Sequence, residues 1–277
     1  MKREIRTLTA VYLFVLLILM ISASFSGIMN IIVYILSFVL PLFFGIWASK
    51  KSGILEEQEG ENLFSIKRRD IGISLSLVFP SVLLVLSVSL STAFLFEALF
   101  GISQGEIDVL SGGSVLAVIS YAILPAILEE LLFRYLPIRL MGKRSPRLAL
   151  ILSAIFFALI HHSFFSIPYA FVAGIIFMAV DLSVGSVIPS MIIHFINNLI
   201  ALLSMGAFGA QLSIGKLFLF VGALSLISLA YLFVKRQRVF PRLRSTFSSE
   251  GKYHLSAEPL FFAVPSLFIA VCELLLL

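Results

Sequence analysis

The chain has 277 residues, of which 60% are hydrophobic and 13% are charged, and its mean hydropathy is +1.10. A soluble domain carries about 25% charged residues, so this composition excludes an ordinary soluble protein and indicates one that crosses a membrane several times. The formal net charge of +5 would also fit a nucleic-acid-binding protein, but the placement of the charges points to another cause.

Apolar stretches of roughly 20 residues, the length that crosses a bilayer, recur along the chain. They lie at 8–25, 28–48, 72–98, 114–140, 148–164, 168–182, 185–205 and 215–234. Of these, 168–182 is short for a full crossing. A ninth candidate, 259–277, is interrupted by Pro265 and Glu273. The sequence therefore predicts an all-α, polytopic membrane protein with about eight transmembrane helices, or about nine if the last stretch also crosses.

The basic residues predict an orientation. With the N-terminus in the cytoplasm, the inner segments are 1–7, 49–71, 139–147, 183–184 and 235–258. They contain every lysine and arginine except Arg134, inside a span, and Lys216, at the outer end of another. This is the positive-inside pattern of an integral protein of the cell membrane, and it explains the net charge without a nucleic-acid partner. Asp181, near a span end, is expected at the interface.

Three ionisable residues interrupt the span 114–140. On a helix, Glu130 and Arg134 are four residues apart and close enough to pair, whereas Glu129 points about 100° away and needs another partner. Facing lipid alone, the three would cost on the order of 8–10 kcal/mol, and such groups usually mark a working site. A purely structural Glu130–Arg134 pair would leave Glu129 unexplained. Pro125 cannot donate a backbone hydrogen bond to Tyr121, which predicts a kink.

Two later spans supply polar partners for these carboxylates. His161 lies near the end of the span 148–164, and His194 and Asn198 share one face of the span 185–205 because they are four residues apart. From the rise of about 1.5 Å per residue, Glu129, His161 and His194 lie at comparable depths. These positions are consistent with a single polar cavity.

Three motifs in this order, on separate hydrophobic spans, resemble those of the CAAX protease and bacteriocin-processing family of intramembrane proteins, which includes the type II CAAX prenyl endopeptidases. The motifs are Glu129-Glu130-x-x-x-Arg134, Phe157-x-x-x-His161 and His194-x-x-x-Asn198. The resemblance covers about residues 113–205. It implies an all-helical membrane fold and the hydrolysis of a peptide bond inside the bilayer.

The resemblance also implies a role for each motif residue. Glu129 would be the general base that activates water, His161 would position that water, His194 and Asn198 would stabilise the oxyanion, and Glu130 and Arg134 would form a supporting pair. The chemistry is reasonable in itself. Free water is a very weak acid, so its attack on an amide needs a positioned base. A donor aimed at the developing oxyanion is worth about 3–4 kcal/mol.

We accordingly expect three regions. Residues 1–112 would hold N-terminal transmembrane helices and an inner loop, 113–205 a catalytic core of four helices, and 206–277 a C-terminal transmembrane helix and tail. The implied partner is a membrane-associated peptide or protein, with a prenylated CAAX peptide as one candidate. No cofactor is implied by the resemblance.

A metal-dependent mechanism is the less favoured variant. Two glutamates and two histidines are acceptable zinc ligands, and His162 would be a further one. However, the chain has no HExxH motif, and an adjacent Glu–Glu pair cannot project both side chains to one point from a regular helix.

Two other functions fit the same residues. A proton-coupled transporter would use buried Glu, His and Arg as a relay, but the sequence shows no internal repeat and no matched pair of broken helices. A non-enzymatic membrane scaffold or immunity protein would keep the fold alone. Every motif position is filled, which weakens that reading.

Overall fold

The computed structural model describes residues 2–22, 24–54, 62–100, 115–161, 163, 166–207 and 214–248. All regular secondary structure in these segments is helical, which confirms the predicted all-α class. The long helices are α1 (Lys2–Ser22), α2 (Gly27–Lys51), α3 (Ile71–Phe100), α6 (Pro146–Leu159), α7 (Ser166–Val184), α8 (Ile188–Ala207), α9 (Ile214–Val234) and α10 (Arg236–Ser248).

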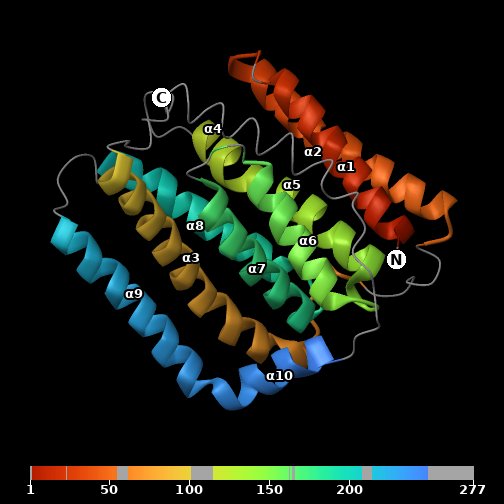
Figure 1. Ribbon diagram of the computed structural model, residues 1–277. Coiled ribbons are helices and arrows are strands. Elements are labelled where there is room, and N and C mark those ends of the chain that lie inside the picture. Colours follow the sequence, from red (N-terminus) through yellow and green to blue (C-terminus); the bar gives the residue numbers. More distant parts are fainter. Residues whose placement is uncertain are drawn as a thin grey trace.

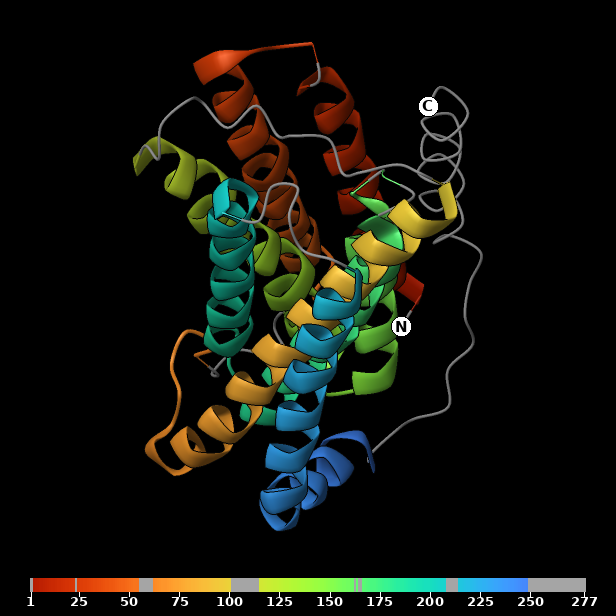
Figure 2. The same ribbon diagram turned by 90° about the vertical axis from the view of Figure 1, so that its left-hand side faces the viewer.

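The helices form a bundle with a central group and two flanking pairs (Figure 1). α6, α7 and α8 lie in the centre with the polar span that contains Glu129, and α6 packs closely against α7. α1 and α2 pair with each other on one side. On the other side α9 runs beside α3, as both views show (Figure 2). The predicted site therefore lies on central helices that have neighbours on both sides.

Five helices of the described chain are long and apolar enough to cross a membrane. They are Lys2–Ser22, Gly27–Lys51, Arg68–Ala93, Val115–Gly142 and Ser166–Val184, and a sixth is added if the bent pair of α9 and α10 counts as one span. The predicted count of eight or nine is thus not confirmed, because α6 and the Ile188–Leu203 part of α8 are apolar but shorter. The ninth candidate, 259–277, lies outside the described residues.

The expectation that 168–182 is the short segment is wrong. That stretch belongs to α7, which has 19 residues, whereas α6 has only 14. At about 1.5 Å per residue, α6 is roughly 21 Å long, less than the roughly 30 Å of a hydrocarbon core. Pro146 begins α6 and Ile160 ends it, so the predicted span 148–164 loses its last turn, and His161 lies in that turn.

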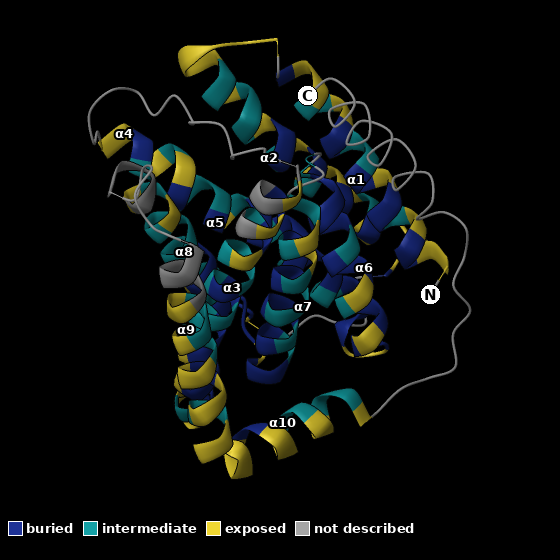
Figure 3. Ribbon diagram, turned by 60° about the vertical axis from the view of Figure 1, so that its left-hand side comes forward, coloured by how far each residue is buried: buried dark blue, intermediate teal, exposed yellow. Residues whose placement is uncertain are grey.

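Many large apolar side chains of the described helices are exposed. Figure 3 colours the exposed positions yellow. Examples with more than half of their surface exposed are Leu17, Ile28, Phe43, Leu75, Leu219 and Phe233. Hydroxyl groups on the same helices are satisfied locally, since Ser49, Ser87 and Thr92 each donate to the carbonyl four residues earlier. An apolar exterior with internally satisfied polar groups is what a lipid environment requires, and the chain is an integral membrane protein.

The polar span is a chain of short helical pieces rather than one regular helix. α4 (Val115–Val118) and α5 (Leu124–Glu130) are separated by the π-helical turn η3 (Ile119–Ile123), and the π-helical turns η4 (Leu131–Tyr135) and η5 (Ile138–Gly142) follow. Pro125 is the second residue of α5, which follows η3. Because Pro125 has no N–H for Tyr121, the helix departs from α-geometry where a distortion is predicted.

The segment after α9, expected to be a basic inner stretch, contains α10. This helix is bent by 84° from α9 and lies under α3 and α7 in Figure 1. Arg242 attaches it, because Nε donates to the Ser183 carbonyl at 2.6 Å and Nη2 contacts Asp70 Oδ1 at 3.2 Å. Val239 is buried at the same contact. A helix of four arginines is therefore part of the folded bundle.

α6 and α7 approach each other at a pair of small residues. A Cβ atom added to Gly174 would lie 2.8 Å from the Cα atom of Ala154. Such a distance is too short for any side chain, so the helices meet backbone to backbone here, as is common for small residues in membranes. The approach brings Phe157 of α6 near Phe177 of α7, with ring centroids 6.2 Å apart.

We predict that Gly174→Ala destabilises the protein by about 1–3 kcal/mol, because the added methyl group forces α6 and α7 apart. The measurement is the apparent thermal midpoint in detergent. Gly222→Ala in α9 is the matched control, since nothing lies within 4 Å of its new Cβ atom, and it should be neutral or slightly stabilising. Equal midpoints for the two variants would contradict the close approach.

Candidate functional site

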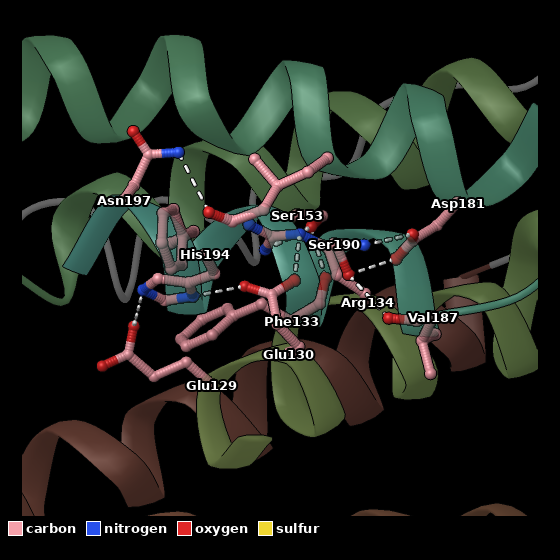
Figure 4. Close-up of polar contacts among 12 residues, drawn as sticks. Glu129, Glu130, Phe133, Arg134, Ser153, Asp181, Val187, Ser190, His194 and Asn197 are labelled. Carbon is pink, nitrogen blue, oxygen red and sulfur yellow. Dashed lines mark hydrogen bonds and ion pairs between the residues drawn. The ribbon is translucent and has the colours of Figure 1, made fainter. Parts of the chain in front are cut away.

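Glu130 and Arg134 form a fully buried ion pair at the centre of the bundle (Figure 4). Arg134 Nε lies 3.1 Å from Glu130 Oε2, and both side chains have 0% exposure. The predicted pairing across one helical turn is therefore present. Two charges without access to water are tolerated only with compensating partners, so the surroundings of the pair decide its role.

Arg134 is enclosed by aromatic rings and one hydroxyl group. Its guanidinium carbon lies 4.4 Å from the ring centroid of Phe157 and 5.3 Å from that of Phe177, close enough for cation–π attraction. Nη1 also donates to Ser153 Oγ at 3.3 Å, and Ser153 in turn donates to the Phe133 carbonyl. Residues of α6 and α7 thus hold the cation in place.

The imidazole ring of His194 lies between the two adjacent carboxylates. Nδ1 is 2.8 Å from Glu130 Oε1, and Nε2 is 3.9 Å from Glu129 Oε2. The carboxylates therefore do not meet at a point but face opposite sides of one ring. Because a carboxylate paired with Arg134 can only accept, Nδ1 carries a proton in this contact. The other nitrogen, Nε2, is the one directed at Glu129.

Glu129 finds its second partner outside the predicted motifs. The Tyr34 hydroxyl group of α2 donates to Glu129 Oε1 at 2.7 Å. The other oxygen, Oε2, is buried, and no residue in the described part of the chain forms a hydrogen bond with it. Sequence reasoning required another partner for Glu129 but did not identify it, because nothing in the pattern around Tyr34 relates it to a residue 95 positions later.

His161 lies just after α6, and its ring shares a neighbour with His194. The Phe157 ring centroid is 5.0 Å from His161 and 5.8 Å from His194, with both pairs edge to face. His161 Nδ1 is 2.7 Å from the Phe157 carbonyl, which can only accept, so Nδ1 carries the proton. The neutral ring then presents Nε2 as an acceptor. His161 is also close enough to Glu129 and His194 for electrostatic interaction.

Asn198 follows His194 by one turn of α8 and is half-buried. Within the described part of the chain, no hydrogen bond joins its amide to Glu129, Glu130 or His194. The neighbouring Asn197 differs, because its Nδ2 donates to the Ile193 carbonyl at 2.9 Å on the same helix.

The turn from α7 to α8 sets the position of His194 and includes a residue whose environment was predicted wrongly. Asp181 was expected at the interface, but it is fully buried. Its carboxylate accepts from Ser190 N at 3.0 Å and from Ser190 Oγ at 2.6 Å, which caps the first turn of α8. Gly185, with φ of +76°, ends α7 in the left-handed conformation that glycine favours. Both features fix where α8 starts.

The acidic and histidine side chains of the site are also the residue types that could bind a metal ion. Among the described residues, no group of three or more His, Cys, Asp or Glu side chains is arranged to hold a metal ion. Glu130 is engaged by Arg134 and His194, and His161 Nδ1 by a carbonyl. His162, the additional ligand considered from the sequence, lies outside the described residues.

Residues 111–200 match the model of one protein family, type II CAAX prenyl endopeptidase Rce1-like. This segment is Rce1-like. It contains all three sequence motifs, so the resemblance read from them is confirmed, and the family indicates a CAAX-type intramembrane protease acting on a membrane-associated protein. None of the curated proteins and none of the solved structures compared with the chain matches it. The three predicted regions of the chain stay a prediction.

We predict that Arg134→Met in the Rce1-like segment lowers the stability by about 3–5 kcal/mol, because it leaves the Glu130 carboxylate buried without its cation. Thermal unfolding in detergent measures the loss. Arg69→Met is the matched control, since Arg69 pairs with Asp70 at 3.6 Å but is 76% exposed, and its loss should stay within about 1 kcal/mol.

The same experiment extends to a double variant. Glu130→Gln combined with Arg134→Met removes both charges, so it should lose less than the sum of the single variants. Strict additivity of the two losses would show that the pair is not energetically coupled.

Proposed function

We propose that this chain is an intramembrane endopeptidase in which Glu129 activates a water molecule to hydrolyse a peptide bond of a membrane-associated substrate. One observation carries the proposal. Glu129 Oε2 is buried, has no hydrogen-bond partner among the described residues and lies 3.9 Å from His194 Nε2. This separation is too long for a direct hydrogen bond but suits two groups that share one water molecule.

In the proposed reaction, Glu129 accepts a proton from that water while the water oxygen bonds to the carbonyl carbon of the substrate. The carbonyl oxygen becomes an oxyanion. When the intermediate collapses, the C–N bond breaks, and the proton held by Glu129 passes to the leaving nitrogen. The products are a carboxylic acid and an amine, and the glutamate returns to its starting state.

His161 is proposed to orient the attacking water. The contact of its Nδ1 with the Phe157 carbonyl leaves Nε2 as an acceptor in the neutral ring, which suits a group that accepts a hydrogen bond from water. The Phe157 ring packs against both histidine rings. One side chain of α6 therefore contacts both His161 and His194.

His194 and Asn198 are proposed to stabilise the oxyanion. His194 can donate from Nε2 only when the ring carries a proton on both nitrogens, because Nδ1 is already committed to Glu130. In that state the charges of Glu129, Glu130, Arg134 and His194 sum to zero, which suits a buried cluster. Asn198 donates through its amide without any change of charge.

The substrate and the orientation belong to the proposal as well. A prenylated CAAX peptide is the first probe to use, because the matching family is described by that substrate class. We also propose that the N-terminus is cytoplasmic, since the described inner segments carry nearly all of the basic residues. The four arginines of α10 then lie at the inner surface.

We predict that Glu129→Gln abolishes cleavage of a prenylated CAAX peptide by the purified protein in detergent, because glutamine cannot accept the proton from water. Glu4→Gln is the matched control: it changes a buried glutamate that pairs with Arg144, far from the site, and should keep the activity. Full cleavage by Glu129→Gln would remove Glu129 as the base.

Exhaustive chelation tests the metal variant in the same assay, and the wild-type activity should survive it. Loss of activity that zinc restores would replace the glutamate mechanism by a metal-dependent one.

We predict that Asn198→Ala lowers kcat by about 10²–10³-fold with a smaller change in KM, as expected for the loss of one oxyanion donor. Asn197→Ala is the matched control, because its amide nitrogen donates within its own helix. Steady-state kinetics of both variants measure the difference. A larger loss in Asn197→Ala would transfer the role to that neighbour.

A further inference from the structure

Tyr34 is the one side chain from α2 that makes a hydrogen bond to a motif residue among the described residues. Its hydroxyl group donates to Glu129 Oε1 at 2.7 Å. α2 precedes the Rce1-like segment 111–200, so this contact is supplied by a part of the chain that the family match does not cover. The candidate site therefore extends beyond its three motifs.

The hydroxyl group of Tyr34 is held in a defined position. Its ring packs against Phe38 with centroids 4.9 Å apart, one turn along α2. Ser37 Oγ donates to the Tyr34 carbonyl oxygen at 2.6 Å, a second hydrogen bond made by Tyr34 in this turn of α2. α2 packs against both α5 and η4, the pieces that carry Glu129 and Arg134. A partly buried and packed tyrosine on a neighbouring helix is a well-defined donor.

We propose that Tyr34 is a positioning residue that assigns different tasks to the two oxygens of Glu129. Oε1 is held by the phenol, and Oε2 is left as the basic oxygen beside His194 Nε2. This inference rests on the proposed endopeptidase activity, because it specifies which atom of the base receives the proton.

The reason lies in the freedom of a glutamate carboxylate. Rotation about its last torsion is broad and nearly two-fold, so without a fixed donor either oxygen can face His194. A hydroxyl hydrogen bond to an ionised carboxylate is shorter and stronger than a neutral one, and it selects a single orientation. With Oε1 engaged, the lone pairs of Oε2 remain directed into the site.

Tyr34→Phe tests the assignment, because it removes one oxygen atom and keeps the ring that packs against Phe38. Tyr34 reaches the substrate only through Glu129, so KM should stay within about twofold while kcat falls on the order of tenfold, the effect of one hydrogen bond to a charged group. Tyr231→Phe is the matched control. Its ring packs against Phe79, where α9 meets α3, and its kcat should equal that of the wild type.

Steady-state kinetics with the prenylated CAAX peptide decide the matter when the wild type cleaves and Glu129→Gln does not. A fall in kcat alone supports the assignment. An unchanged kcat in Tyr34→Phe overturns it. A rise in KM with kcat unchanged also overturns it, because Tyr34 would then contact the substrate itself.

A second measurement does not depend on activity. The apparent thermal midpoint is compared for the wild type, Tyr34→Phe, Glu129→Ala and the double variant. If Tyr34 acts on Glu129, the shift caused by Tyr34→Phe is present in the wild-type background and absent with Glu129→Ala. The same shift in both backgrounds overturns the inference. If the wild type cleaves no peptide, the proposed function fails and this cycle alone decides whether Tyr34 and Glu129 are coupled.

Discussion

The buried pairing of Glu130 with Arg134 is the interaction on which the site depends. Both side chains have no exposure, so neither charge is tolerable without the other and without further partners. Arg134 receives its partners from Ser153, Phe157 and Phe177, and Glu130 receives His194. Satisfying one ion pair therefore brings α6, α7 and α8 together around the polar span, and the same contacts orient the imidazole ring.

The two adjacent glutamates differ in how their carboxylate oxygens are engaged. Glu130 Oε2 lies 3.1 Å from Arg134 Nε and Oε1 lies 2.8 Å from His194 Nδ1. Glu129 Oε2 has no hydrogen bond among the described residues, and His194 Nε2 lies 3.9 Å from it. Two adjacent glutamates thus have opposite environments within a few ångströms. The π-helical turn η4 begins directly after them, so the local backbone is not a regular α-helix where the two side chains diverge around His194. The irregular turn follows the two glutamates, which contact the two nitrogens of the His194 ring from opposite sides.

Much of this site is accessible from the sequence, because its determinants are local. The pairing of Glu130 with Arg134 follows from their spacing of four residues, and the shared face of His194 and Asn198 follows in the same way. The ordered motifs on separate apolar spans predicted the family model that residues 111–200 match. The positions of the helices follow from the apolar runs. The number of helices that cross the membrane does not, because α6 ends at Leu159, before the end of the apolar stretch that contains it.

The contacts that sequence reasoning missed are those between distant segments. Tyr34 and Glu129 are 95 residues apart, and no periodicity relates them. Asp181 looked interfacial because it is a charge near a span end, but the turn at Gly185 folds α8 back so that Ser190 covers it. The helical nature of α10 was hidden by its low hydropathy. In each case packing between helices, which is not encoded by local pattern, determined the environment.

The attachment of α10 by Arg242 has a practical consequence for anyone who handles this protein. One guanidinium group contacts Ser183 near the end of α7 and Asp70 just before α3, so residues that follow α9 help to close this end of the bundle. A purification tag or a reporter inserted between Val234 and Ser248 would separate these contacts.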